Sequence, residues 1–274
     1  MANFGRFNSS LFNAGVRTSQ GAWLDDIIFN GFWLQNKHFI TEKANPRDMP
    51  SISLLTYSNP KDDGGGLLDR FYKQRTITLR GHILGDSLQD TDYRIDTLKK
   101  ALSVKEWYLD RKMGDGTYRR ILCTLTNTNI IDREHYDREH GAYTLTFRAE
   151  QPFRQEKVRS SYNFSEITDE INEDIYNQGS EYSNPIINIL VSGANNCNKV
   201  IVWIGETKIE IDHSLEEDDI IDINTDEKVV LLNNNSIDFN GRFPKLLAGV
   251  NTLNVQANGT FNFDVSVLFP KNYL

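Results

Sequence analysis

The chain has 274 residues and a mass of 31.5 kDa, with 39% hydrophobic, 11% aromatic and 25% charged residues. This composition excludes a disordered or fibrous protein, and the length predicts about two domains. The net charge of −8 argues against a general nucleic-acid binder, which would present a basic surface. Residues 1–157 hold 23 lysines and arginines against 20 acidic residues, whereas residues 158–274 hold 7 against 18. The change in charge near Lys157 predicts a boundary between domains 1–157 and 158–274.

Targeting and redox signals are sparse. The first residues carry no apolar core behind a basic region, so we expect no secretory signal. No apolar run approaches the length of a membrane span, so we expect no membrane insertion. Cys123 and Cys197 are isolated and form no disulfide framework, which favours two small buried side chains. We therefore expect the protein to be made and folded in a cytoplasm.

The first elements surround a long irregular segment. Residues 22–40 predict strands joined at Asn30-Gly31, a strong signal for a β-hairpin. Residues 43–70 are punctuated by proline, asparagine and a glycine run, and a loop this long inside a domain is usually functional or disordered. They nevertheless carry a short apolar stretch that predicts one strand within this excursion. Its residues are Ile52, Leu54, Leu55 and Tyr57.

The rest of the first half predicts a sheet with one helix. Residues 75–85 alternate apolar and polar side chains, as in a half-buried strand. A helix follows, capped by Asp90 or Asp92, with an apolar face and lysines near its end. The residues of that face are Ile95, Leu98 and Leu102. Further strands are predicted at residues 106–110, 118–127 and 143–149. We expect an α+β domain.

The second half shows no helical period. Residues 151–184 are polar and acidic and predict an irregular joint between the domains. Short strands then follow at close spacing, separated by glycine, asparagine and aspartate turns, which is typical of an antiparallel sandwich. These strands are predicted at residues 186–191, 200–204, 208–211, 220–224, 229–232, 252–255 and 261–269.

No motif points to catalysis or to a metal. The segment "DREHYDREH", residues 132–140, places His135 and His140 five residues apart, off one helix face and on opposite strand faces. The acidic run 216–219 lacks the spacing of a calcium loop, and the glycines 64–66 lack the Lys-Ser/Thr pair of a phosphate loop. We predict no enzyme, no cofactor and no metal site.

One tryptophan is a candidate contact residue. Trp203 lies between Val202 and Ile204 on a predicted strand of the second half. If those two neighbours face the core, Trp203 faces outward, where it could contact a glycan or a protein partner. A core tryptophan in the opposite orientation is equally compatible with the pattern.

The order of elements carries a resemblance to a known family. Residues 20–155 contain "DDIIFNGFWL", then "GGGLLDRFYKQRTITLRGHILG", the helix "DYRIDTLKKALS" and finally "AYTLTFRAEQPF". In this order they resemble the distal tail proteins of long-tailed, non-contractile bacteriophages. The second half, through "NQGSEYSNPIINI" and "PKLLAGVNTLNV", is similar to the galectin-like β-sandwich of that family. The resemblance implies a mainly β fold, with an α+β ring domain and an outer sandwich.

The resemblance also implies a structural function in the virion. The first domain would form a sixfold ring that continues the tail tube and lets DNA pass without binding it. The excursion 43–70 would be a belt that contacts the neighbouring subunit through Ile52, Leu54, Leu55 and Tyr57. The other expected partners are the tail tube protein, the tail-associated hub protein and a receptor-binding or fibre protein. The protein would lie at the distal end of the tail, after assembly in the host cytoplasm.

Two alternatives remain at this point. The chain could be another ring-forming tail component, such as a tube or terminator protein, although those usually lack a second sandwich. It could instead be a sugar-binding β-sandwich module of a secreted or surface protein. The missing secretory signal and the low cysteine content disfavour that second alternative.

Overall fold

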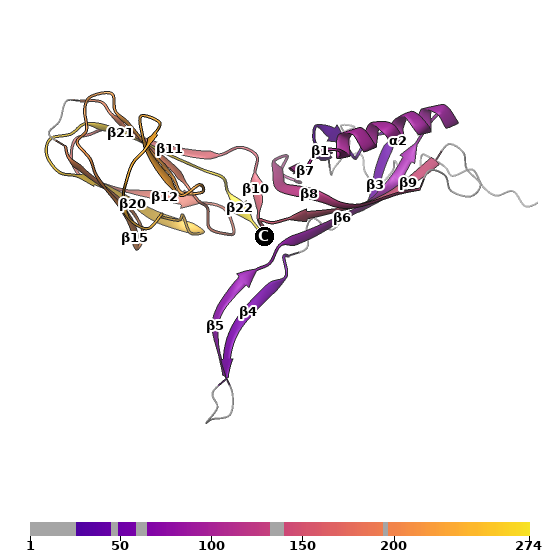
Figure 1. The fold of residues 1–274 in the computed structure, drawn as a ribbon, viewed down its shortest axis with the longest axis horizontal. Coiled ribbons are helices and arrows are strands. Elements are labelled where there is room, and N and C mark those ends of the chain that lie inside the picture. The colour runs from indigo at the N-terminus through magenta and orange to yellow at the C-terminus, as the bar shows by residue number, and fades with distance from the viewer. Residues whose placement is uncertain (1–25, 45–48, 59–64, 132–139, 194–196) are drawn as a thin grey trace, which may run out of the picture. The chain divides into compact units, whose positions relative to one another are not determined.

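The computed structural model describes residues 26–44, 49–58, 65–131, 140–193 and 197–274. It contains two compact units, one of residues 1–154 with Leu274 and the other of residues 155–273 (Figure 1). Strands dominate both units, and α2 (Leu88–Leu102) belongs to the first. The predicted mainly β fold class is therefore confirmed. No helix among the described residues is long and apolar enough to cross a bilayer.

The first unit is built on an antiparallel sheet. Seven of its strands follow the order β2-β1-β7-β8-β9-β6-β3, and β4 and β5 pair separately. The strands in this unit are β1 (Ile27–Phe29), β2 (Phe32–Trp33), β3 (Phe39–Ala44), β4 (Ile52–Ser58), β5 (Gly65–Tyr72), β6 (Arg75–Leu84), β7 (Trp107–Lys112), β8 (Tyr118–Ile131) and β9 (His140–Ala149).

Local sequence explains the first turn and the central strand pair. Asn30 and Gly31 both have positive φ, 50° and 72°, which suits the tight turn between β1 and β2 and confirms the predicted hairpin. Strands β6 and β9 pair without a break from Arg75↔Ala149 to Leu84↔His140. Burial alternates along both strands, so one face of the pair enters the core and the other stays polar.

Helix α2 covers the apolar face of this sheet. Ile95, Leu98 and Leu102 are buried in the same core cluster as residues of β6 and β9, which confirms the predicted helix face. The predicted cap is wrong, because Ser87 is the N-cap and its Oγ accepts a hydrogen bond from the Asp90 backbone N–H, 3.2 Å away. Asp90 lies one turn inside, where its carboxylate accepts from the Asp86 backbone N–H at 2.9 Å. This hydrogen bond, and after it the one from the Arg94 side chain, lowers the pKa of Asp90.

A glycine on β6 permits the closest approach in the first core. A side chain at Gly81 would collide with the Ile40 carbonyl oxygen and lie 2.7 Å from the hydroxyl of Tyr143. Tyr143 is fully buried, and burial raises its pKa to about 12. Its hydroxyl is 2.8 Å from Thr41 Oγ1 and donates to the Leu34 carbonyl at 3.3 Å. Gly81 is therefore required by a buried polar contact as well as by packing.

The second unit has two antiparallel sheets. One has the order β11-β21-β13-β16-β17-β18, and the other has the order β12-β20-β14-β15-β19. The strands from Arg154 onward are β10 (Arg154–Glu156), β11 (Ser160–Ile167), β12 (Ile171–Asn177), β13 (Ile186–Val191), β14 (Lys199–Ile204), β15 (Thr207–Asp212), β16 (Ile220–Asn224), β17 (Val229–Leu232), β18 (Asn235–Ser236), β19 (Asn240–Gly241), β20 (Gly249–Ala257), β21 (Phe263–Phe269) and β22 (Asn272–Tyr273).

The two sheets enclose one apolar core. Side chains from β13, β14, β20 and β21 alternate between this core and the outer faces, as in a β-sandwich. The predicted antiparallel sandwich is thereby confirmed. The irregular joint predicted for residues 151–184 is wrong, because β10, β11 and β12 lie in it. Strand β12 exposes Glu173 and Asp174 in its middle, which hides the alternation of its buried residues.

An ion-pair cluster lies on the outer side of β14 and β15. Glu210 accepts hydrogen bonds from Lys199 Nζ at 2.9 Å and pairs with Lys208 Nζ at 2.5 Å. Hydrogen bonding to Lys208, followed by that to Lys199, lowers the pKa of Glu210 to about 2. These charges extend over the outer face of the sheet and hold its two strands in register.

Candidate binding surfaces

The excursion predicted between β3 and β6 contains an antiparallel hairpin of β4 and β5. Its register runs from Ile52↔Tyr72 to Leu55↔Asp69, and then from Thr56↔Leu67 to Ser58↔Gly65. The shift between these two ladders leaves Leu68 as an extra residue on β5, a β-bulge. The two strands form a sheet of their own, drawn apart from the larger sheet in Figure 1.

The hairpin exposes apolar side chains on both of its faces. Strand alternation and the register place Ile52, Leu54 and Leu67 on one face, and Leu55 and Phe71 on the other. Between four-tenths and six-tenths of each large apolar side chain is exposed. The exposed apolar residues of the hairpin are Ile52, Leu54, Leu55, Tyr57, Leu67, Leu68 and Phe71. Exposed apolar side chains gathered on one short hairpin in this way indicate a site of interaction.

Local contacts stiffen the hairpin without covering it. The ring of Tyr57 lies over Gly66, where a Cβ atom would approach the ring to 2.5 Å. The Arg70 guanidinium donates to the Tyr72 hydroxyl at 3.2 Å, and the Tyr72 ring packs edge-on against Phe153 at 5.6 Å. An isolated two-stranded hairpin is marginally stable in water, so these contacts alone stabilise the β4–β5 hairpin only weakly.

The residues predicted for subunit contact all lie on β4. Ile52, Leu54, Leu55 and Tyr57 are brought together there and are exposed, while their role as contacts is a prediction that the isolated chain does not test. Sequence analysis missed the apolar residues of β5. Their signal was the apolar content of "GGLLDRFY", but the adjacent Leu67 and Leu68 interrupt the period of two, because Leu68 is the bulge.

Trp203 occupies the outer face of the second sandwich sheet. Its neighbours Val202 and Ile204 are buried in the core, and Trp203 is half-buried on the opposite side of β14. Its cross-strand neighbours are Lys208 on β15 and Asn254 on β20. Of the two orientations compatible with the sequence, the structure therefore has the outward one.

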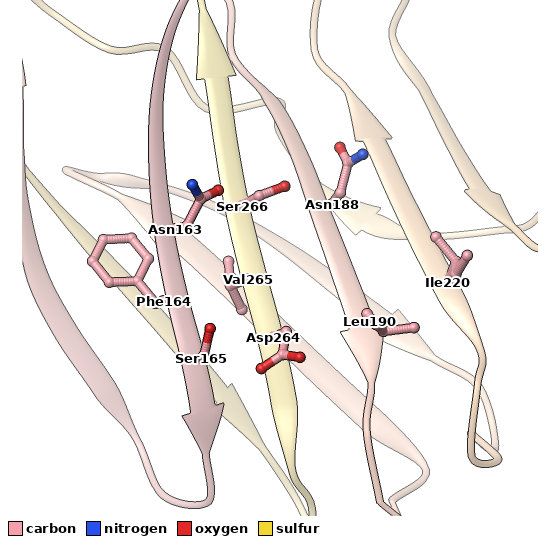
Figure 2. A pocket seen from close by; sticks show the side chains of 9 residues that line it. All are labelled: Asn163, Phe164, Ser165, Asn188, Leu190, Ile220, Asp264, Val265 and Ser266. Carbon is pink, nitrogen blue, oxygen red and sulfur yellow. The ribbon is translucent and has the colours of Figure 1, made fainter.

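A shallow trough of about 410 Å³ lies on the outer face of the other sandwich sheet. Figure 2 shows Asn163 on β11, Ser266 on β21 and Asn188 on β13 side by side across it. They are cross-strand neighbours, through the register pairs Asn163↔Ser266 and Asn188↔Ser266. Leu190 and Ile220, also directly paired across strands, form the apolar end of the trough. This site could not be predicted from the sequence, because its residues come from four strands far apart in the chain.

The carboxylate in the trough already has partners. Asp264 Oδ1 accepts a hydrogen bond from the Glu166 backbone N–H, and Oδ2 accepts one from Ser192 Oγ, both at 2.9 Å. These bonds tie β21 to Ser192, just after β13, and to Glu166 in the bulge of β11, which adopts a positive φ of 57°. Asp264 therefore shapes the trough, while the free polar groups belong to the row above it.

Chemistry elsewhere is limited. Within the described ranges, no cluster of three or more histidine, cysteine, aspartate or glutamate residues could hold a metal ion. The "DREHYDREH" segment lies outside those ranges except for His140. Cys123 and Cys197 are buried free thiols, and burial raises the pKa of Cys123 to about 12, so it stays protonated and unreactive at neutral pH.

Comparisons with known proteins give a family match and a fold match. The family model "Siphovirus-type tail component, C-terminal domain" matches residues 178–273. A chain of the crystal structure titled "SPP1 Dit (gp 19.1) Protein, a Paradigm of Hub Adsorption Apparatus in Gram-positive Infecting Phages" aligns with a TM-score of 0.71 and 14% identity, covering 91% of this chain and 99% of that chain.

Chains of the phage P2 baseplate in its activated conformation align less closely. The structure with Ca gives a TM-score of 0.46 and 11% identity over 89% of this chain and 97% of that one. The structure with Sr gives 0.44 and 11% over 88% and 97%. No curated protein matches the chain. The chain thus has the fold of SPP1 Dit over nine-tenths of its length, its second unit matches the siphovirus-type tail component family, and the resemblance to distal tail proteins is confirmed.

Proposed function

We propose that the protein is a structural component of the distal end of a phage tail, where it forms the hub ring that joins the tail tube to the baseplate or tail tip. The fold of SPP1 Dit and the family match of residues 178–273 support this function. The observation that carries it is the β4–β5 hairpin, whose apolar side chains are exposed on both faces. Such a surface requires a partner in the assembled state.

The partner proposed for the hairpin is a neighbouring copy of the chain. A surface that contacts a different patch on the next subunit makes a heterologous contact, and heterologous contacts close into rings when the rotation permits. Residues 1–157 form the ring domain in this proposal, with the excursion 43–70 as its belt, and residues 158–274 form an outer domain. Ile52, Leu54, Leu55 and Tyr57 are the proposed belt contacts, and the ring is a hexamer.

The remaining partners follow from the position at the tail end. The ring meets the tail tube protein on one side and the tail-associated hub protein on the other, and DNA passes through its lumen without specific binding. The acidic second unit faces outward and scaffolds a receptor-binding or fibre protein, with Trp203 as a proposed contact for that protein partner. Assembly takes place in the host cytoplasm. The function is mechanical and involves no catalysis.

Deletion of residues 45–69 tests the ring. This change removes β4 and most of β5 while β3 and β6 keep their own pairing. Electron microscopy and native mass measurement of the intact chain should show rings with a central opening of roughly 20 Å or more, the width that duplex DNA needs. The deletion should give a folded monomer. Rings that persist after deletion, or an intact chain that stays monomeric at every concentration, would contradict the proposal.

A further inference from the structure

The trough on the outer face of β11, β21, β13 and β16 has a defined set of free polar groups. Four polar side chains that line it have no hydrogen-bond partner among the described residues: Asn163, Ser165, Asn188 and Ser266. The side-chain amide oxygen of Asn188, Oδ1, is also buried, and an unpaired buried acceptor costs free energy. Asn188 lines the trough, and a rotation that exchanged the oxygen and nitrogen of its amide would let a ligand hydroxyl donate to this oxygen.

The lining excludes most charged ligands. Of the residues that the structure describes, no lysine, arginine or histidine lines the trough, so a phosphate or carboxylate would find no counter-charge there. The carboxylate of Asp264 uses both oxygens for bonds within the protein, which leaves it poorly placed to hold a cation. The free groups are two amides and two hydroxyls, which both donate and accept hydrogen bonds. They match a neutral ligand whose own groups both donate and accept hydrogen bonds.

The apolar end of the trough adds a second requirement. Leu190 and Ile220 stand directly opposite each other, with about four-tenths of each side chain exposed. They would pack against the C–H groups of a ligand whose hydroxyls reach the row of Asn163, Ser266 and Asn188. The trough volume of about 410 Å³ lies within the range of small-molecule sites, roughly 300–1,000 Å³. We propose that this trough binds a saccharide.

A protein partner fits this surface less well. Protein interfaces are centred on large aromatic or arginine anchors and bury about 800 Å² on each side. Figure 2 shows the trough floor formed by short polar side chains, with the ring of Phe164 directed away from it. The saccharide site goes beyond the proposed hub function and does not depend on ring formation. A monomeric chain can therefore test it, and its failure would leave the ring proposal intact.

Methyl NMR of the full chain tests the site directly. Selectively labelled Leu190 and Ile220 methyl groups report at the apolar end, and the Trp203 indole reports on the opposite sheet. The probes are D-glucose, D-galactose, N-acetyl-D-glucosamine and L-rhamnose, each titrated separately. At least one should shift the Leu190 and Ile220 signals in a saturable way, with a dissociation constant on the order of 1 mM, as expected for a small ligand on an open surface.

Three variants separate the trough from the rest of the sandwich. Asn188→Leu removes the amide on β13, between Ser266 and the apolar end of the trough, and should raise the dissociation constant by about tenfold or more. Asn172→Leu is the matched control, because Asn172 is an exposed residue of β12, on the other sheet, and its variant should bind as the wild type does. Asn163→Leu repeats the test in case Asn188→Leu disturbs folding.

Three results would overturn the proposal. The first is the absence of saturable shifts with all four sugars. The second is a shift of the Trp203 indole while Leu190 and Ile220 stay unchanged, because the sugar would then bind the other sheet. The third is binding by folded Asn188→Leu and Asn163→Leu chains with the affinity of the wild type.

Discussion

The hairpin makes a quantitative prediction for the double variant Leu54→Asn, Leu67→Asn. Both side chains lie on the same hairpin face, with 59% and 60% of their surface exposed. Burying a whole leucine contributes about 2 kcal/mol, so covering six-tenths of each would contribute about 1.2 kcal/mol per residue. The variant should therefore weaken each subunit contact by about 2.4 kcal/mol, or roughly 60-fold in its dissociation constant.

Sedimentation of the assembled protein measures this change, with Leu247→Asn as the matched control. Leu247 is 63% exposed in the second unit, so its variant makes the same chemical change away from the hairpin and should assemble as the wild type does. The unfolding free energy of the monomer should stay within about 0.5 kcal/mol of the wild type, because both hairpin leucines are solvated there. Unchanged assembly would refute the hairpin contact, and a large loss of monomer stability would show that these leucines pack within their own chain.

Three further predictions concern the two units themselves. Gly81→Ala should destabilise the first unit by about 2 kcal/mol or more in urea unfolding, because the new Cβ meets the Ile40 backbone carbonyl, which cannot move aside; a neutral effect would contradict this. Glu210→Gln should make the melting temperature depend less on pH in the acid range. In the wild type, the stabilisation from Glu210 is fully present above its unfolded pKa near 4.5 and is lost as the pH falls toward about 2. Circular dichroism melts at several pH values measure this difference. Leu145→Ala and Ile189→Ala each empty a fully buried site, in the first and second unit respectively. Each should lower the unfolding free energy of its own unit by about 2–5 kcal/mol, seen as a shift of one calorimetric transition with the other unchanged. A shift of both transitions by one substitution would contradict independent folding of the two proposed domains.

The elements that the sequence predicts well are those whose residue pattern is uninterrupted within one turn, strand or helix. The Asn30-Gly31 turn, the alternation along β6 and the apolar face of α2 each depend on neighbours within one element. The helix cap was misassigned because Ser87, Asp90 and Asp92 all carry capping oxygens, and the choice among them depends on where the backbone first turns. The strands β11 and β12 were missed because polar, exposed residues interrupt their apolar pattern, serines and an asparagine in β11 and acidic residues in β12.

The candidate surfaces show where local patterns stop being informative. Half of the hairpin could be predicted, since β4 concentrates its apolar residues, but the bulge at Leu68 breaks the period that would have revealed β5. The orientation of Trp203 was undecided because a strand buries every second residue on either face, and only the packed core of Val202 and Ile204 selects one.

The trough is the extreme case of the same limit. Asn163 and Ser266 are about a hundred residues apart in sequence, yet they become direct neighbours through the pairing of β11 with β21, and Asn188 joins them through β13. Each of these side chains is an ordinary polar residue on the solvent side of its own strand, so no single strand carries a binding signal. The register creates the row, and a slip of one residue in β21 would replace Ser266 with a core side chain such as Val265 or Val267. The buried alternation of β21 therefore positions the trough, because the core residues that hold the sandwich together also determine which polar groups meet on its surface.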